Sequence, residues 1–555
     1  FLPSCQPKEK ATMILYNGAV ATMDQANPSA EAVAFNGDRI LLVGTTEAVK
    51  ALKSEMTKMI DLRGNFAMPG FIEGHGHFSN LGKSLMNLNF LKTKNWNEIV
   101  AMVAEKAKTA QPGEWIEGRG WHQEKWNEVL ERSVHGYPYH DALSAVSPDN
   151  PVLLRHASGH GVFANKKAME IAGINAETPN PNGGEIVRDG SGEAIGMFEE
   201  RAMKLVYGAF ETYKKTLSEE DLKNQWYQAI DLAQEECLQK GITSFQDAGS
   251  SYEEIDRYQK MAEEGKLNHR LWVMLRHSHE RMKGNLGQFP ILDAGNHFFT
   301  CRAIKSEVDG ALGSYGAWLL AAYRDKPNFL GQNTTTIEEV TNIAKLAADA
   351  DMQLCVHAIG DRANREVINI FENMIQSDPE KDWRWRIEHA QHLHPDDIPR
   401  FRELGIIASM QGIHCTSDAP FVVARLGERR AREGAYPWRS LLDAGVIIAN
   451  GTDAPVEDVD PIESFYASVT RKRADTGFEF FTEQKMTREE ALHSYTLGNA
   501  YAGFEEKDKG SLEVGKLADV VVLTKDLRTC KDEEIMDAEV VMTIVGGAIK
   551  YERSE

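Results

Sequence analysis

The chain has 555 residues, of which 42% are hydrophobic and 26% are charged. This composition is typical of a globular protein and excludes a disordered chain, a collagen-like fibre or a low-complexity scaffold. Its 62 basic and 83 acidic residues give a formal net charge of −21, which disfavours binding to nucleic acids because the surface repels phosphate. No apolar run approaches the ~18–20 residues of a membrane-spanning helix, so we expect no transmembrane span.

The first residues resemble a targeting signal. Residues 2–6 read Leu-Pro-Ser-Cys-Gln, similar to the end of a bacterial lipoprotein signal, in which Cys5 would carry the lipid. We therefore expect residues 1–11 to be a tether, and the protein to be periplasmic or anchored to the membrane by a lipid at Cys5. The alternative is a cytoplasmic protein with an ordinary exposed cysteine. The six cysteines form no C-x-x-C pair, which argues against a zinc ribbon or a disulfide framework.

Both ends of the chain are rich in short strands. Residues 31–35 and 39–43 flank Asn36-Gly37-Asp38, a typical hairpin turn in which glycine supplies a positive φ. Apolar strands are also predicted over residues 518–523 and 540–545. We expect residues 12–67 and 505–555 to form one small β-sandwich domain, because chain ends commonly lie close together.

The middle of the chain, residues 68–504, alternates short apolar strands with amphipathic helices. This alternation predicts βαβ units with a parallel sheet, and we expect a (β/α)8 TIM barrel. Between about 81 and 240 the alternation breaks, and Gly, Pro, Trp and His become frequent. We interpret this stretch as an insertion over the barrel mouth, where loops shape the substrate site.

Two histidines lie on the first predicted strand of this middle part, near its C-terminal end. His75 and His77 stand two residues apart, so on a strand both imidazoles project from the same face. A single histidine of this kind is usually a satisfied core residue. A pair is less easily explained that way, since burying two imidazoles without partners is costly.

Four further polar residues come at or just after the ends of predicted strands: Lys305, His357, His389 and Asp453. Each has an ordinary explanation taken alone, such as a solvated charge for Lys305 or a helix N-cap for Asp453. Together they match the active site of a barrel, which gathers residues from the carboxyl ends of several strands. Nitrogen and carboxylate ligands without thiolates suit Zn²⁺, Mn²⁺, Co²⁺ or Fe²⁺.

Several blocks of the sequence resemble the amidohydrolase superfamily and, within it, the YtcJ-like branch that includes N-substituted formamide deformylase. The resemblance covers nearly the whole chain. It is carried by Pro69-Gly70-Phe71 with His75 and His77, by K-S-E-V-D-G-A-L-G-S (305–314), H-A-I-G-D-R-A-N (357–364), R-I-E-H-A-Q (386–391) and G-T-D-A-P-V (451–456), and by the closing segment at 495–496 and 510–519. The branch usually has Arg-Thr where this chain has Tyr315-Gly316, and a proline where it has Gly412, so the substrate stays open.

The resemblance implies a ligand set for one or two divalent cations, zinc above all, with manganese, iron or cobalt as alternatives. His75 and His77 would hold the more buried metal with Asp453, while His357 and His389 would hold a second. Lys305 would bridge the two after CO₂ converts it to a carbamate, which requires a neutral amine of the kind that burial favours.

The implied reaction is hydrolysis of an amide-type C–N bond in a small molecule. A metal lowers the pKa of water to ~7, and Asp453 acts as general base and then as the acid that protonates the leaving amine.

Other residues are assigned to the surroundings of this centre. The G-H-x-x-x-x-N element with His160 resembles a substrate-binding or carbonyl-polarising element of the branch, although a structural loop histidine is equally consistent. Trp121 offers the wall of an apolar pocket or core packing, and His414 is a weak substrate-side candidate. Asp309 and Arg362 are candidates for orienting the metal ligands.

Two other functions remain open at this point. Deamination of a small heterocycle would use the same barrel, metal and aspartate and differs in its products. A non-catalytic metal-binding regulatory protein would share the fold, but the complete ligand set argues against lost catalysis. The oligomeric state is also open, with a homodimer the commonest arrangement for soluble enzymes.

Overall fold

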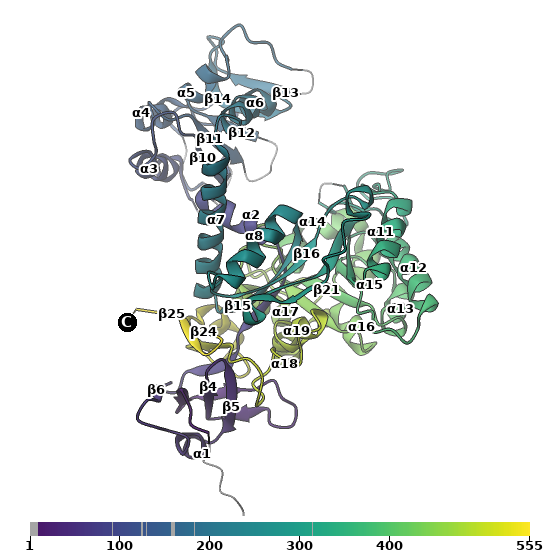
Figure 1. The fold of residues 1–555 in the computed structure, drawn as a ribbon. Helices are drawn as coiled ribbons and strands as arrows, with labels where there is room; N and C mark the ends of the chain where they lie inside the picture. The colour runs from purple at the N-terminus through teal and green to yellow at the C-terminus, as the bar shows by residue number, and fades with distance from the viewer. Residues whose placement is uncertain are drawn as a thin grey trace, which may run out of the picture. The chain divides into compact units, whose positions relative to one another are not determined.

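The structure is a computed structural model that describes residues 9–90, 93–123, 126–128, 130–156, 161–181, 184–313 and 315–554. The chain divides into two compact units (Figure 1). We call Phe1–Phe78 with Gln234–Glu555 the main unit, and Ser79–Ala233 the insert unit. Within the described residues, no helix combines the length and the apolar character needed to cross a membrane.

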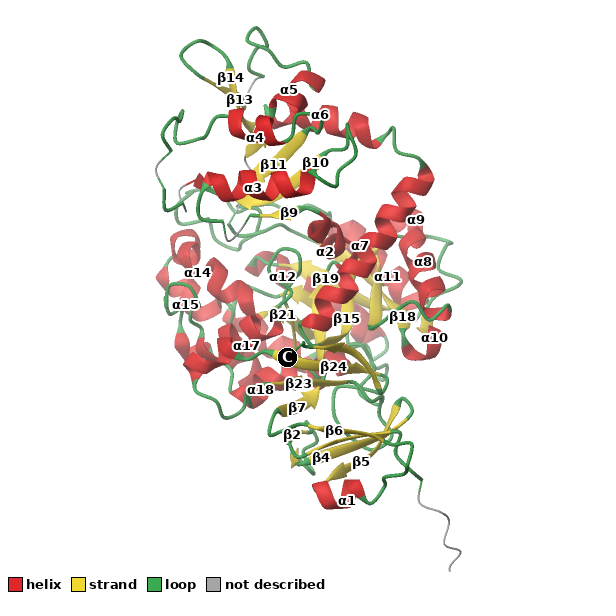
Figure 2. Cartoon of the chain, turned by 90° about the vertical axis from the view of Figure 1, so that its left-hand side faces the viewer, coloured by secondary structure: helices red, strands yellow, loops and turns green. Residues whose placement is uncertain are grey.

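The two ends of the chain form a small β-sandwich in the main unit (Figure 2). One sheet has the order β5-β4-β1-β6, from β1 (Met13–Tyr16), β4 (Ala32–Asn36), β5 (Arg39–Gly44) and β6 (Lys58–Asp61), with α1 (Thr46–Lys50) beside it. The other has the order β25-β24-β23-β7-β2-β3, from β2 (Ala19–Ala21), β3 (Ser29–Ala30), β7 (Phe66–Pro69), β23 (Val520–Leu523), β24 (Val540–Val545) and β25 (Ala548–Glu552).

Apolar residues of both sheets share one buried cluster that includes Leu15, Phe35, Val520 and Ile544, because strand alternation turns one face of each sheet inward. The antiparallel pairing of β7 with β23 joins the two chain ends directly.

Among the described residues, eight strands form the barrel of the main unit, in the order β22-β21-β20-β19-β18-β16-β15-β8. They are β8 (Phe71–Gly76), β15 (Ile242–Ser250), β16 (Arg270–Leu275), β18 (Phe299–Glu307), β19 (Gln353–Ala358), β20 (Arg386–His389), β21 (Ile407–Gln411) and β22 (Ile448–Gly451), with β17 (Ile291–Asp293) antiparallel to β18. Successive barrel strands pair in parallel. The ring closes where Asp453 N donates to His75 O (2.7 Å) and His77 N donates to Ala454 O (2.7 Å). The predicted α/β barrel with an additional sheet domain is therefore confirmed.

Helices follow the barrel strands and cover the outside of the sheet (Figure 1). They are α8 (Tyr252–Glu263), α9 (His279–Met282), α10 (Ala294–His297), α11 (Ile337–Asp349), α12 (Asp361–Ser377), α13 (Ile398–Glu403), α14 (Gly412–Leu426), α15 (Glu428–Gly434), α16 (Trp438–Asp443), α17 (Pro461–Thr470), α18 (Arg488–Ser494) and α19 (Leu497–Ala502). The start of α8 shows how the sequence sets these boundaries: Ser251 and Glu254 form a reciprocal capping box. Ile255, Tyr258 and Met261 then recur at helical spacing and are buried.

The insert unit occupies the part of the chain in which the strand–helix alternation breaks. Its sheet has the order β13-β14-β12-β11-β10-β9, from β9 (Leu88–Asn89), β10 (Ile116–Trp121), β11 (Val152–His156), β12 (Gly161–Ala164), β13 (Gly184–Arg188) and β14 (Ala194–Glu200). The associated helices are α2 (Phe78–Met86), α3 (Trp96–Ala107), α4 (Asp141–Val146), α5 (Lys166–Ile171), α6 (Met203–Lys214) and α7 (Glu219–Gln239), the last of which ends in the main unit. Two buried apolar clusters give this unit a core of its own.

Candidate metal centre

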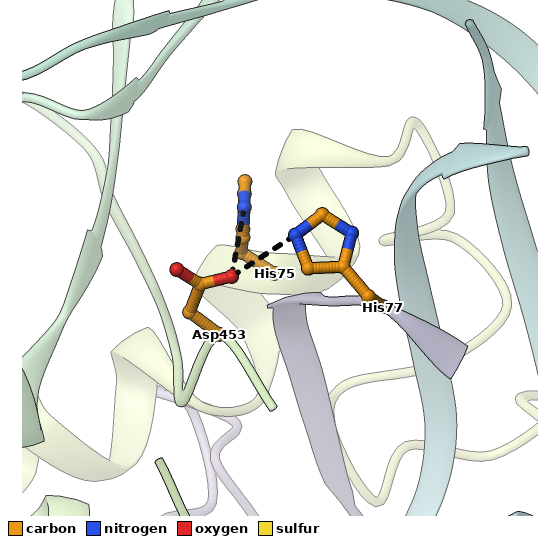
Figure 3. Close-up of side chains that lie close together, drawn as sticks. All are labelled: His75, His77 and Asp453. Carbon is orange, nitrogen blue, oxygen red and sulfur yellow. Dashed lines mark ion pairs between the residues drawn. The ribbon is translucent and has the colours of Figure 1, made fainter. Parts of the chain in front are cut away.

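Two histidines and an aspartate converge where β8 meets the end of β22 (Figure 3). The Nε2 atoms of His77 and His75 lie 3.2 and 3.6 Å from Asp453 Oδ1. His75 is fully buried and Asp453 nearly so, while the His77 side chain remains 24% exposed. The two imidazoles face the same carboxylate because they stand two residues apart at the end of one strand.

A second group of possible ligands shares the same aspartate. His389, His414 and Asp453 bring one ligand atom each to within 4.8 Å of one another. His389 ends β20 with a φ of 75°, and Asp453 has a φ of 58°. Non-glycine residues rarely adopt this left-handed conformation, and it concentrates at functional sites. His414 comes from the first turn of α14, which follows β21 without an intervening loop.

These donors fit a divalent cation. The Nε2 atoms of His75, His357 and His414 are among the buried polar atoms of the described residues that have no hydrogen-bond partner. Burial lowers the pKa of His75 to about 4, so its imidazole is neutral at pH 7 and can offer a lone pair. Burial opposes the ionised form of Asp453, but the hydrogen bond with His77 and the neighbouring histidines together outweigh it and hold the pKa of that carboxyl well below its usual range. Neutral imidazoles and an ionised carboxylate are the forms that bind zinc and similar metals.

Lys305 and His357 lie close to these groups on neighbouring strands. Lys305 is 3% exposed, and burial lowers the pKa of its amine. His357 has its ring 4.4 Å from that of His389 and its Nε2 3.7 Å from Asp309 Oδ1. The structure thus gathers the expected ligands at one end of the barrel. His414, which was expected on the substrate side, belongs to the possible ligand group of His389 and Asp453. His357, which was expected to be a ligand, belongs to neither of the two groups.

The residues expected around the centre have different environments. Asp309 is buried and accepts hydrogen bonds from the backbone of Trp318 (2.8 Å), Ile359 and Gly360 (both 2.9 Å), while burial raises its pKa to about 7. It therefore holds together the loops after β18 and β19, beside His357. Arg362 pairs instead with Glu366 on its own helix (2.7 Å).

The insert unit contains the other two expected residues. Trp121 is fully buried in its core, where the indole N–H donates to Leu154 O (3.1 Å), so the ring serves packing. His160 lies outside the described residues.

Two carboxylates at the centre were not assigned a role from the sequence. Glu73 is buried and accepts from the backbone N–H of Thr452 (2.7 Å) and of His75 (3.2 Å), so it ties β8 to the segment that carries Asp453. Burial raises the pKa of Glu73 to about 8. Glu388 accepts a hydrogen bond from His75 Nδ1. Sequence spacing could have indicated both: Glu73 and His75 stand two residues apart on one strand and so share a face, as Arg386 and Glu388 do on another.

Comparison with known proteins agrees with this geometry. Residues 58–551 match the model of the family described as "Amidohydrolase family", which is most of the chain. The chain belongs to this family. As a member, it is a metal-dependent hydrolase by fold and by its His/Asp groups.

Three relatives align with nearly the full chain. The Arabidopsis thaliana protein LONG AFTER FAR-RED 3 is 30% identical over 98% of this chain and 92% of its own length. The putative amidohydrolase YtcJ of Bacillus subtilis is 29% identical, covering 98% of this chain and 99% of that protein. N-substituted formamide deformylase of Arthrobacter pascens is 28% identical, covering 98% of each. The resemblance to the YtcJ-like branch is therefore confirmed.

A solved structure shows the same architecture. The crystal structure of an uncharacterized metal-dependent hydrolase from Pyrococcus horikoshii superposes with a TM-score of 0.73 and 25% sequence identity, over 94% of this chain and 99% of that one.

Proposed function

We propose that the protein hydrolyses an amide-type C–N bond of a small molecule, with Asp453 as the group that moves the proton. The observation that carries the proposal is the position of Asp453, whose carboxylate is shared by two sets of histidines. A catalytic carboxylate must reach both the attacking water and the leaving nitrogen, and a residue that belongs to both ligand groups is suited to both.

His75, His77 and Asp453 would hold one divalent cation, and His389, His414 or His357 a second. A cation held there would supply Lewis-acid chemistry, polarising a substrate carbonyl and lowering the pKa of water to ~7. Asp453 accepts a proton from the water as the water oxygen forms its bond to the carbonyl carbon. The protonated Asp453 then gives this proton to the nitrogen as the C–N bond breaks, so that an amine leaves rather than an amide anion.

Lys305 is proposed to carry a carbamate when two cations are bound. Burial lowers the pKa of this amine, although the carboxylates of Glu388 and Asp453 oppose the shift. The neutral amine, which burial favours, attacks CO₂ through its lone pair with loss of one proton from nitrogen. The product is an anionic ligand with two oxygens, whereas an ammonium group would repel cations. Zinc is the proposed metal, because the donors are imidazole and carboxylate.

Metal analysis with a panel of N-formyl, N-acyl and cyclic amides tests this function. We expect one or two divalent ions per chain, and an amine plus a carboxylate as products. Ammonia released from a ring amidine would instead identify a deaminase. A protein that binds the metal but hydrolyses none of the panel, while Asp453→Asn leaves its metal content unchanged, would favour a non-catalytic role.

A further inference from the structure

We propose that Glu388 is a positioning residue that fixes His75 in the tautomer whose Nε2 lone pair faces the metal centre, and that Arg386 holds Glu388 in place. The inference rests on the proposed metal-dependent function, which it deepens by assigning one carboxylate to the support of one ligand group. Neither residue touches the site where substrate would react.

The contact between Glu388 and His75 determines where the imidazole proton lies. Glu388 Oε2 lies within hydrogen-bond distance of His75 Nδ1, and both side chains are 0% exposed. An ionised carboxylate only accepts hydrogen bonds, so Nδ1 must carry the hydrogen. A neutral imidazole has one N–H, which leaves the lone pair on Nε2. That atom faces Asp453 Oδ1 at 3.6 Å and has no hydrogen-bond partner among the described residues.

Arg386 keeps Glu388 ionised and immobile. Its guanidinium donates to Glu388 Oε1 from Nε (2.7 Å) and to Oε2 from Nη2 (3.1 Å). It also donates to the backbone oxygen of Gly74 (2.7 Å), to Ser409 Oγ (2.8 Å) and to Gln246 Oε1. A fully buried guanidinium therefore ties β8, β15, β20 and β21 together beneath the metal centre, and Glu388 cannot rotate without breaking this network.

Two other imidazoles of the centre, those of His389 and His414, are held by neutral side-chain amides. His389 Nδ1 contacts Gln411 Oε1 at 2.7 Å, and His414 Nδ1 contacts Gln391 Nε2 at 3.0 Å. Only His75, of these three, is supported by a carboxylate. A carboxylate raises the basicity of an imidazole ligand more than an amide does. The cation held with His75 should consequently bind more tightly than one held with His389, and should be the last to leave.

The first test needs no metal. In the metal-free protein labelled with ¹⁵N-histidine, we expect a slowly exchanging His75 Nδ1–H resonance, because this proton is buried in a hydrogen bond to a charged acceptor. Glu388→Gln should shift it strongly upfield, and Glu388→Ala should abolish it. A His75 signal that shows Nε2 protonated, or one that ignores both substitutions, would overturn the proposal.

The second test is zinc affinity, measured by competition with a chromogenic chelator. We expect Glu388→Gln to lower the affinity of the tighter site about 10–100-fold, the range found when such supporting groups are replaced. Glu505→Gln is the matched control, because Glu505 is also largely buried and pairs with Lys509 (2.8 Å), but lines a cavity at the start of β16 and β18. Equal affinities in the two variants would refute the role of Glu388.

A double variant guards against misfolding. Removing the charge of Glu388 alone leaves Arg386 buried and unpaired, which can destabilise the fold by itself. Arg386→Met combined with Glu388→Gln removes both charges, and should keep the fold while still weakening zinc binding. If the unaltered protein binds no divalent cation at all, the proposed function fails. If the unaltered protein binds zinc, and Glu388→Gln and the double variant bind it as tightly as the unaltered protein does, only this inference fails.

Discussion

Breaking the buried ion pair between Arg270 and Asp519 should strongly destabilise the main unit. Arg270 begins β16 of the barrel, and Asp519 directly precedes β23 of the β-sandwich. Two hydrogen bonds join them (2.7 and 3.0 Å), and the residues are 1% and 5% exposed. In Asp519→Ala, Arg270 keeps a backbone contact to His297 O (3.1 Å) but loses its counter-charge. Removing one member of such a pair costs about 3–5 kcal/mol.

Urea unfolding followed by circular dichroism measures this loss. Arg429→Ala is the control, because Arg429 pairs with Glu433 at 2.9 Å with 80% and 44% of the side chains exposed. An exposed pair one helical turn apart contributes only ~0.3–0.5 kcal/mol. Asp519→Ala should thus lower the midpoint of the main unit markedly and Arg429→Ala hardly at all. Similar small effects in both variants would refute the reasoning that burial makes the Arg270 pair costly to break.

The pH dependence of the unfolding free energy gives a second test of the same ion pair. Burial opposes ionisation of Asp519, but the charge of Arg270 and its hydrogen bonds outweigh it and lower the pKa of the carboxyl. A carboxyl whose pKa is lower in the folded than in the unfolded state stabilises the fold above its unfolded pKa of ~3.9, and this contribution is lost as the pH falls through the folded pKa. The difference in unfolding free energy between the unaltered protein and Asp519→Asn should be constant from pH 7 to about 5 and shrink below ~4.

Three further predictions concern the metal centre. Asp453→Asn should abolish turnover while retaining substantial metal by elemental analysis, and high residual activity would refute its role in proton transfer. Dialysis against a strong chelator should remove activity but leave the circular dichroism spectrum intact, and added zinc or manganese should restore turnover. Gly451→Ala should lower both metal content and activity, because its Cβ would lie 2.3 Å from Glu73 Oε1 and 2.6 Å from His75 N. Gly190→Ala is the control, since its Cβ would meet nothing within 4 Å, and equal metal content in the two variants would contradict the expected crowding.

The fold was predictable because local patterns agreed with its large-scale arrangement. The turn at Asn36-Gly37-Asp38 produced the expected hairpin, in which Asn36 pairs with Arg39. The strand over 540–545 matched β24 in full. Periodicity could not show that Ser79–Ala233 builds a sheet of its own, since its strands are short and the order β13-β14-β12-β11 depends on contacts between distant residues.

The candidate site was predictable where the alternation of side chains along a strand is enough to position a residue. His75 and His77 needed only a strand to face one way. The position of His389 did not follow from this alternation, because His389 comes directly after the inward-facing Glu388. Its left-handed backbone redirects the side chain toward His75, and the two rings lie 4.7 Å apart. His414 was undervalued for a similar reason. Nothing in the sequence shows that α14 begins immediately after β21 and places its first turn beside the barrel end.

Closure of the barrel and assembly of the centre depend on the same residues, but through different atoms. The backbone of His75, His77, Asp453 and Ala454 forms the hydrogen bonds that join the last strand to the first. The side chains of the first three form the ligand group. A change of side chain alone therefore leaves closure intact, since the backbone hydrogen bonds persist. This separation is why the loss of turnover expected for Asp453→Asn can be attributed to chemistry, provided that the variant unfolds at the same denaturant concentration as the unaltered metal-free protein.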